Sequence, residues 1–138
     1  MIRFQVAGQA RAKGSMRAFV PKGWTRPIVT STSTSVKDWE QTIGHVAQKF
    51  SGSYTTGPVR VRLHFVLARP KSLSSRASRA HCKRPDLDKL CRAALDALTG
   101  VLWKDDSQVY ALSALKTYAK AGEPPRVIVT VHNKGETA

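Results

Sequence analysis

The 138-residue sequence predicts an α+β fold, a single small domain in which a mixed β-sheet of about four strands is packed against two main helices. Three observations favour this class. Several segments alternate apolar and polar residues with the period-2 pattern of half-buried strands. Two others carry the apolar spacing of amphipathic helices. The length fits one domain, since domains commonly contain about 100–150 residues. We therefore expect residues 1–138 to follow the order β, β-excursion, α, β, α, β, β.

The first half of the chain supplies two strands and one helix. Residues 2–6 (IRFQV) alternate as a strand. Residues 8–30 form a basic, glycine-containing segment that we expect to make a loose β-excursion and loop. Ser35 is a suitable N-cap for an amphipathic helix that runs to about Phe50. Residues 58–67 (PVRVRLHFVL) then predict a strand with one buried face and one basic face.

A second basic loop precedes the second helix. Residues 69–84 have no hydrophobic periodicity, and we expect a mobile loop that becomes ordered on a phosphate backbone. Pro85 favours an extended conformation at the residue before it. The helix is predicted from the apolar stripe that follows, and Gly100 suits its C-terminal cap. The stripe comprises Leu87, Leu90, Cys91, Ala94, Leu95 and Leu98.

Two further strands are predicted to complete the sheet. Residues 108–118 alternate, residues 127–131 are strongly β-prone, and we expect the tail at 133–138 to be frayed. In the first of these strands, one face is predicted to carry Val109, Ala111, Ser113, Leu115 and Thr117.

The charge balance indicates a polyanionic partner, with nucleic acid as the first candidate. The chain has 23 Lys and Arg against 9 Asp and Glu, a formal net charge of +14. A membrane partner fits poorly, because no apolar run approaches the roughly 18–20 residues that span a bilayer and the N-terminus lacks a signal-peptide core. Two cysteines form no disulfide framework. We expect a cytoplasmic protein.

Four carboxylates stand out within this basic chain, at Asp86, Asp88, Asp105 and Asp106. At an extended helix entry, Asp86 and Asp88 can converge on one ion, and we expect the short return after the helix to bring the second pair to the same place. Three carboxylates form the hard oxygen site that Mg²⁺ or Mn²⁺ takes. The alternative is structural, since acids in a first helical turn complement the helix dipole and Asp86 can act as an N-cap.

The predicted helix surface also places Arg92 between two acids at i,i+4 spacing, Asp88 and Asp96. One interpretation is an ion-pair ladder that contributes only a few tenths of a kcal/mol per pair. The other is that Arg92 reaches phosphate oxygens and stabilises charge in a transition state. For Asp96 we favour a structural role.

These residues carry a family resemblance. The segments RPDLDKL (84–90), LDALTG (95–100) and WKDDSQV (103–109) together resemble the signature of the RusA-type Holliday-junction resolvases, which are widespread in bacteria and their phages. A leading strand, a Lys13-Gly14 basic segment, a helix and a strand also follow in the family's order.

The resemblance implies a homodimeric, Mg²⁺-dependent endodeoxyribonuclease that resolves four-way DNA by paired phosphodiester hydrolysis, in recombination and repair. By motif position it implies metal-binding acids at Asp86, Asp88 and Asp106, with Asp105 as a neighbour. Two departures concern catalysis. This chain has Lys89 where the family usually has Asn, and Arg92 where it usually has a catalytic lysine. Arg92 can replace a lysine that acts by charge, whereas Lys89 would have to replace one that gives up a proton.

The basic segments are predicted to contact DNA. The alternative is that they are solvated loops without a binding role. The predicted contact residues are Lys13, Arg17, Lys22, Arg69, Lys71, Arg76, Arg79, Lys83 and Arg84.

Three other assignments compete with this one. A non-catalytic, basic branched-DNA-binding protein explains the charge but leaves the aspartates as helix and turn residues. A PD-(D/E)xK nuclease needs a second acid and a lysine on a later strand, and these are not evident. A zinc site at His81, Cys82 and Cys91 lacks a paired C-x-x-C spacing.

Overall fold

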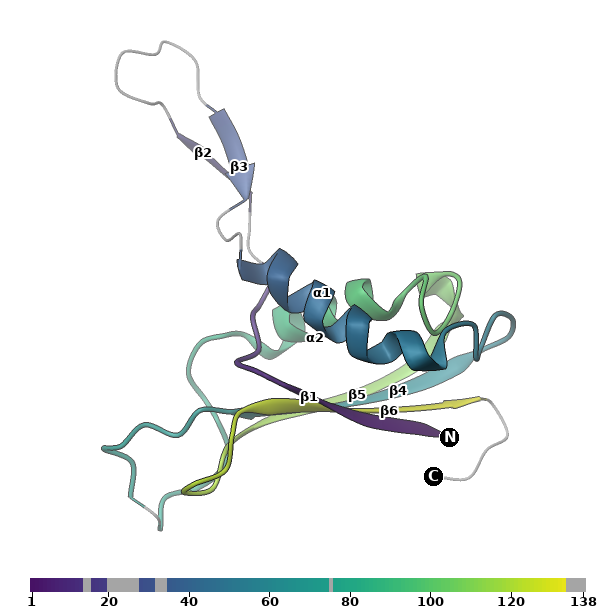
Figure 1. The fold of residues 1–138 in the computed structure, drawn as a ribbon. Helices are drawn as coiled ribbons and strands as arrows, with labels where there is room; N and C mark the ends of the chain where they lie inside the picture. The colour runs from purple at the N-terminus through teal and green to yellow at the C-terminus, as the bar shows by residue number, and fades with distance from the viewer. Residues whose placement is uncertain (14–15, 20–27, 32–34, 75, 134–138) are drawn as a thin grey trace.

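A four-stranded mixed sheet forms the centre of the protein, seen in a computed structural model that describes residues 1–13, 16–19, 28–31, 35–74 and 76–133 (Figure 1). In spatial order the strands are β1 (Ile2–Ala7), β6 (Arg126–Asn133), β4 (Val59–Leu67) and β5 (Val109–Tyr118). β6 pairs antiparallel with both β1 and β4, whereas β4 and β5 are parallel.

Both main helices lie on the same face of this sheet (Figure 1). Helix α1 (Ser35–Ala47) continues into the 3₁₀ turn η1 (Gln48–Phe50), and α2 (Leu87–Leu98) connects the parallel strands β4 and β5. A parallel pair needs such a crossover, because a hairpin cannot join two strands that run the same way. The predicted α+β class, element order and helices are confirmed. No described helix is long and apolar enough to cross a membrane.

The core lies between the sheet and the two helices. Alternate residues of β4, including Leu63 and Phe65, are fully buried in this core. Ile43 of α1 and Leu90 of α2 belong to the same core on the helical side. Each such side chain contributes about 1.5–3 kcal/mol through the loss of apolar surface to water. The apolar residues that alternate along the strands thus form one side of the core, and the apolar stripes of the helices form the other side.

The face prediction for β5 is wrong at its first residue. Val109 pairs with Val59 and Ala111 pairs with Arg60, so Tyr110 is an extra residue in β5, and this bulge leaves Val109 and Ala111 on opposite faces of the sheet. Beyond it, Leu112 and Ala114 face the helices, while Ser113, Leu115 and Thr117 face the other way. One extra residue in a strand reverses the alternation, and sequence periodicity alone does not reveal it.

The predicted β-excursion is present as a two-stranded antiparallel ribbon, β2 (Met16–Phe19) with β3 (Ile28–Ser31), which is separate from the main sheet (Figure 1). Two of its predicted DNA contacts, Lys22 and Arg17, stay predictions. Lys22 lies outside the described residues, and for Arg17 the structure describes only the backbone position in β2. Of the tail expected to fray, Asn133 is instead the last residue of β6, and residues 134–138 lie outside the described part.

Lys13, just before the ribbon, has partners that the sequence did not suggest. Its ammonium lies 2.6 Å from a Glu40 carboxylate oxygen of α1 and 3.1 Å from an Asp96 oxygen of α2, and its backbone N–H donates to the Lys89 carbonyl. The pKa of Lys13 is raised, chiefly by the hydrogen bond to Glu40. Lys13 therefore ties the base of the ribbon to both helices, and its ion pair with Asp96 is consistent with the structural role favoured for that acid.

The basic loop at 69–84 is tied to the sheet at its second half. Tyr118 donates its backbone N–H to the carbonyl of Arg79, and His81 donates to that of Lys116, so this stretch runs along the outer edge of β5. Arg79 also donates from its side chain to the Tyr118 carbonyl at 3.3 Å, and Arg69 donates to the Ala119 carbonyl at 3.4 Å. Backbone hydrogen bonds thus join residues 79–81 to β5, a pairing that the sequence did not suggest, and ordering of the loop on DNA stays a prediction.

Candidate functional site

The N-terminal end of α2 holds two carboxylates close to one cation. Asp86 is the extended N-cap residue and Asp88 follows in the first turn. The Lys89 ammonium lies 3.7 Å from an Asp86 oxygen and 3.9 Å from an Asp88 oxygen. Both acids thus lie within 4 Å of one cation, and their role as metal ligands stays a prediction. The Asp86 side chain makes no capping hydrogen bond, which argues against the purely structural alternative for this residue.

A lysine that the sequence did not single out supports this end of the helix. Lys116, near the end of β5, donates from its ammonium to the carbonyls of Lys83 and Pro85 at 2.5 and 2.7 Å. These two bonds fix the backbone that leads into Asp86. The available signal was the alternation of β5, which carries Lys116 on the same face as Leu112 and Ala114.

The C-terminal end of α2 holds Asp106 through a threonine. The Thr99 hydroxyl, at the C-cap, is hydrogen-bonded to an Asp106 carboxylate oxygen and lies 2.8 Å from the Leu95 carbonyl. It also accepts a 2.9 Å hydrogen bond from the indole N–H of the buried Trp103. Gly100, in the left-handed region with φ of 88°, then allows the sharp reversal that brings Asp106 back beside Thr99.

Asp105 has a local structural bond. Its carboxylate accepts from the Ser107 backbone N–H at 2.9 Å and caps the 3₁₀ turn η2 (Asp106–Gln108), an interaction that lowers the pKa of Asp105. Gln108 completes the capping box by accepting from the Asp105 N–H, and it donates to the carbonyls of Tyr54 and Gly57. These bonds fix the start of β5, and they leave Asp106 as the more available acid of the pair.

The two acid groups do not meet within one chain, which corrects the expectation from the sequence. Among the described residues, no three His, Cys, Asp or Glu side chains lie close enough to hold a metal ion. Eleven positions of α2 separate Asp88 from Thr99, about 16 Å at the helical rise. Because the chain reverses after α2, the start of β5 lies beside the last turn of the helix. The other end of β5, at Lys116, is the part of the strand that lies near the first turn of α2.

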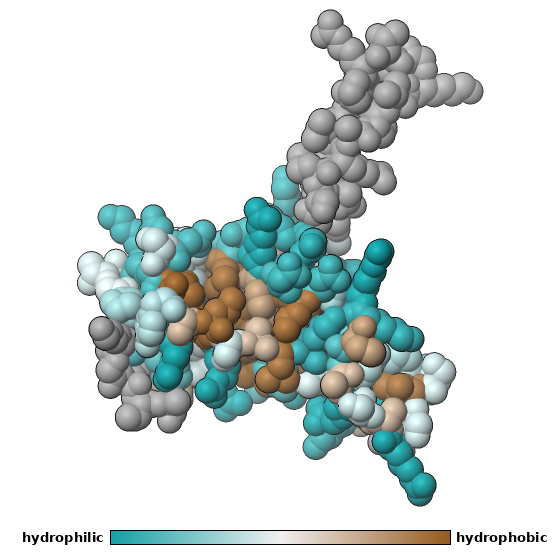
Figure 2. Space-filling view, turned by 180° about the vertical axis from the view of Figure 1, so that it is seen from behind, coloured by the Kyte–Doolittle hydropathy of each residue, from teal (hydrophilic) through white to brown (hydrophobic). Residues whose placement is uncertain are grey.

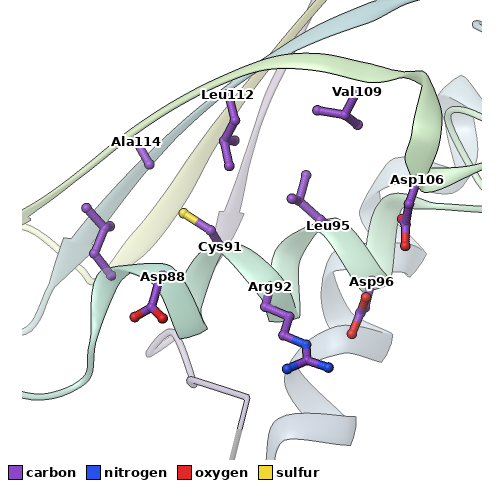
Figure 3. Close-up of a pocket in the computed structure, with 10 residues that line it drawn as sticks. Asp88, Cys91, Arg92, Leu95, Asp96, Asp106, Val109, Leu112 and Ala114 are labelled. Carbon is purple, nitrogen blue, oxygen red and sulfur yellow. The ribbon is translucent and has the colours of Figure 1, made fainter.

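A groove of about 800 Å³ between α2 and β5 connects the two ends. Figure 3 shows Asp88 near one end and Asp106 near the other, with Arg92 and Asp96 on the helix between them. The apolar part of the groove is lined by Leu87, Cys91, Leu95, Val109, Leu112 and Ala114. Figure 2, which views the molecule from behind Figure 1, shows an apolar area of this kind bordered by hydrophilic surface.

Arg92 is available to bind an anion at this groove. No ion pair joins its guanidinium to Asp88 or Asp96 in the described part of the chain, and Asp96 is paired with Lys13 instead. Figure 3 shows the Arg92 side chain directed away from the sheet. The ion-ladder interpretation is therefore not supported. Cys91, by contrast, belongs to the apolar lining at the floor of the groove, and burial raises the pKa of its thiol.

Comparison with known proteins supplies the family. The family model described as endodeoxyribonuclease RusA matches residues 6–132, nearly the whole chain. The chain belongs to the RusA endodeoxyribonuclease family. The RusA match spans the main sheet and both helices, and so includes both ends of α2. The chain is also similar to the uncharacterized protein YqaN of Bacillus subtilis (strain 168), with 29% identity over 140 residues that cover 94% of each chain.

Membership of the RusA family implies a junction-resolving endonuclease that binds branched DNA. The acids at the groove and the net charge of +14 are consistent with that activity. The resemblance inferred from the three sequence segments is therefore confirmed at the level of the family.

Proposed function

We propose that the protein is a homodimeric, Mg²⁺-dependent endodeoxyribonuclease that resolves four-way DNA junctions by paired phosphodiester hydrolysis. The observation that carries the proposal is the convergence of Asp86 and Asp88 on one cation position at the end of a groove that also carries Asp106. The family match supports the class of reaction, and the charge supports a DNA substrate.

The donor chemistry of these side chains fits Mg²⁺. Asp86 and Asp88 offer carboxylate oxygens only, both are more than half exposed, and a cation already lies within 4 Å of each. Mg²⁺ prefers oxygen donors and commonly binds through one or two carboxylates. When bound, it would activate a water and neutralise charge on the scissile phosphate. Mn²⁺ takes a similar set of donors and is expected to substitute.

A second copy of the chain would supply the missing acid. In a two-fold interface the same patch meets itself, so a two-fold axis that crosses the groove at right angles would bring Asp88 opposite Asp106 of the partner subunit. Two features support this arrangement. The groove floor is apolar, and Leu112 and Tyr110 of the edge strand β5 are 44% and 55% exposed. The dimer would then have two equivalent sites for paired incisions.

Two cations near the acids have distinct proposed roles. Arg92, unpaired within the described residues, would bind a non-bridging phosphate oxygen and stabilise charge there. Lys89, which lies between Asp86 and Asp88, would be displaced from that position when a metal ion binds, and would then face the incoming phosphate. A guanidinium holds its proton firmly, so the role of Arg92 is that of a fixed charge.

The test is cleavage of a synthetic four-way junction by purified protein with Mg²⁺, Mn²⁺ or a chelator. We expect two symmetric incisions that need the metal, and we expect Asp88→Asn to lower the single-turnover rate at least about 100-fold while junction binding persists. Asp38→Asn is the matched control, because Asp38 is an exposed acid of α1 away from the groove.

Binding without cleavage would support the other candidate, a non-catalytic branched-DNA-binding protein. The absence of a three-acid cluster within the described residues of one chain is the observation that favours it. Metal-dependent cleavage that is lost in Asp88→Asn would exclude this candidate.

A further inference from the structure

Acidic and basic residues are divided between the two layers of the protein. The strands β1, β4, β5 and β6 contain no aspartate or glutamate. All described acids except Glu123, which lies in the turn between β5 and β6, belong to the helices or to the turns beside them. The cations and histidines of the strands are Arg3, Arg60, His64, Arg62, Lys116, Arg126 and His132. The sheet is therefore a basic layer beneath a helical layer that carries most of the described acids.

Most of these strand cations point to the side of the sheet without helices. The register pairs Arg3 with Thr130 and Thr130 with Arg62, so the two arginines flank a threonine on that face. In the next rows, His64 lies beside Ile128 and Arg60 beside His132. Figure 1 shows both helices on the opposite face. We call this surface, defined by Arg3, Arg60, Arg62, His64 and Thr130, the open sheet face.

The open sheet face has a hollow of about 260 Å³ in its centre. It is lined by Met1, Arg3, Arg62, His64, Leu115, Ile128, Thr130 and His132. Neighbouring strands lie about 4.8 Å apart, so the backbones of Arg3 and Arg62 are roughly 10 Å apart on either side of it. The hollow therefore combines two guanidinium groups with a hydroxyl, a set of groups that binds phosphate oxygens.

Within the described residues, no acid forms an ion pair with the arginines of this face. Arg3 and Arg62 are exposed and form no ion pair with any described residue, while Arg126 pairs with Glu123 at the edge of the sheet. Burial, followed by the positive charges of Arg126 and Arg79, lowers the pKa of His64. Like charges on one face repel each other. An anionic ligand would reduce this repulsion.

We infer that the open sheet face is a second DNA-binding surface, which contacts phosphates of a duplex arm on the side of the sheet away from the α2–β5 groove. The inference rests on the proposed function for the identity of the DNA. Because the groove is used by the dimer in that proposal, this face stays free in both subunits. A junction bound at the groove would thus have arms held at a distance from the incisions.

The test compares a sheet-face variant, Arg3→Gln with Arg62→Gln, with a control that loses the same charge from the helical layer, Lys37→Gln with Lys49→Gln. Lys37 and Lys49 are exposed on α1 and η1. Affinity for the four-way junction is measured at several salt concentrations between about 50 and 200 mM, and folding is checked by the thermal unfolding midpoint. Both changes keep side-chain length at exposed positions, so we expect near wild-type unfolding midpoints.

We expect the sheet-face variant to bind the junction about 10-fold more weakly, with the slope of log K against log salt reduced by about 2, one for each lost phosphate contact. The control should change the slope by much less. Equal losses in both variants, or wild-type affinity in the sheet-face variant, would overturn the inference.

The rate of nicking at saturating junction separates this inference from the proposed function. A sheet-face variant that binds weakly but nicks normally at saturation supports both. If the wild-type protein never nicks the junction, and the sheet-face variant but not the control binds it more weakly, the nuclease proposal fails and the second DNA-binding surface stands.

Discussion

The two ends of α2 present carboxylates in opposite ways. At the N-terminal end, Asp86 and Asp88 are exposed, and their nearest charged neighbour is a flexible lysine. At the C-terminal end, Asp106 is held by the Thr99 hydroxyl, which also accepts a hydrogen bond from a buried indole N–H. One end therefore offers exchangeable ligands, and the other offers a single preorganised one. In the proposed function the complete site would take acids from both ends, which do not meet within the described residues of one chain.

The largest effect is expected from breaking the contact proposed to join the two ends. Leu112→Asp places a charge in the apolar groove, and we expect a monomer without nicking activity, because burying an unpaired charge is costly. Leu115→Asp is the control for assembly, since Leu115 lies on the same strand but faces away from the helices. Sedimentation measures both variants. A Leu112→Asp protein that stays dimeric would show that the interface lies elsewhere.

A smaller effect is expected at Arg92, which lies between the two ends. Arg92→Gln removes the positive charge, and we expect the single-turnover nicking rate to fall about 100-fold with junction affinity reduced only a few-fold. Arg92→Lys keeps the charge and should restore most of the rate. If the glutamine and lysine variants nick equally fast, Arg92 has no electrostatic role in the reaction.

The smallest effect is expected from loosening the preorganised end. Thr99→Val removes the hydroxyl that holds Asp106 and leaves the indole N–H of buried Trp103 without this partner, so we expect about 10-fold slower nicking and a loss of about 1–2 kcal/mol in unfolding free energy. Thr99→Ser keeps the hydroxyl and is the matched control. Nicking rates and urea denaturation measure the pair. Equal rates in the two variants would mean that Thr99 does not position Asp106.

Much of the fold followed from local patterns, because each pattern reports the side of one element that is buried. The stripe of α2, the alternation of β4 and the end of α2 at Gly100 were all predicted and are confirmed. The face of Val109 was wrong, since a bulge is a property of two paired strands.

The candidate site was predicted in its residue types but not in its arrangement. The convergence of Asp86 and Asp88 depends on adjacent residues at a helix entry, which the sequence specifies. The position of Asp106 depends on the direction in which β5 returns, which is a property of the whole fold. The partners of Lys13 and the role of Lys116 involve contacts between distant segments, and no local pattern identifies such contacts.

The shared site is tested most directly by mixing two inactive variants, Asp88→Asn and Asp106→Asn, under conditions where subunits exchange. If each site takes Asp88 from one subunit and Asp106 of the partner subunit, a mixed dimer has one site with both acids and one with neither. The account predicts that mixing restores nicking, confined to one strand of each junction. Mixed protein that remains as inactive as either variant alone, although subunit exchange is demonstrated, would contradict it.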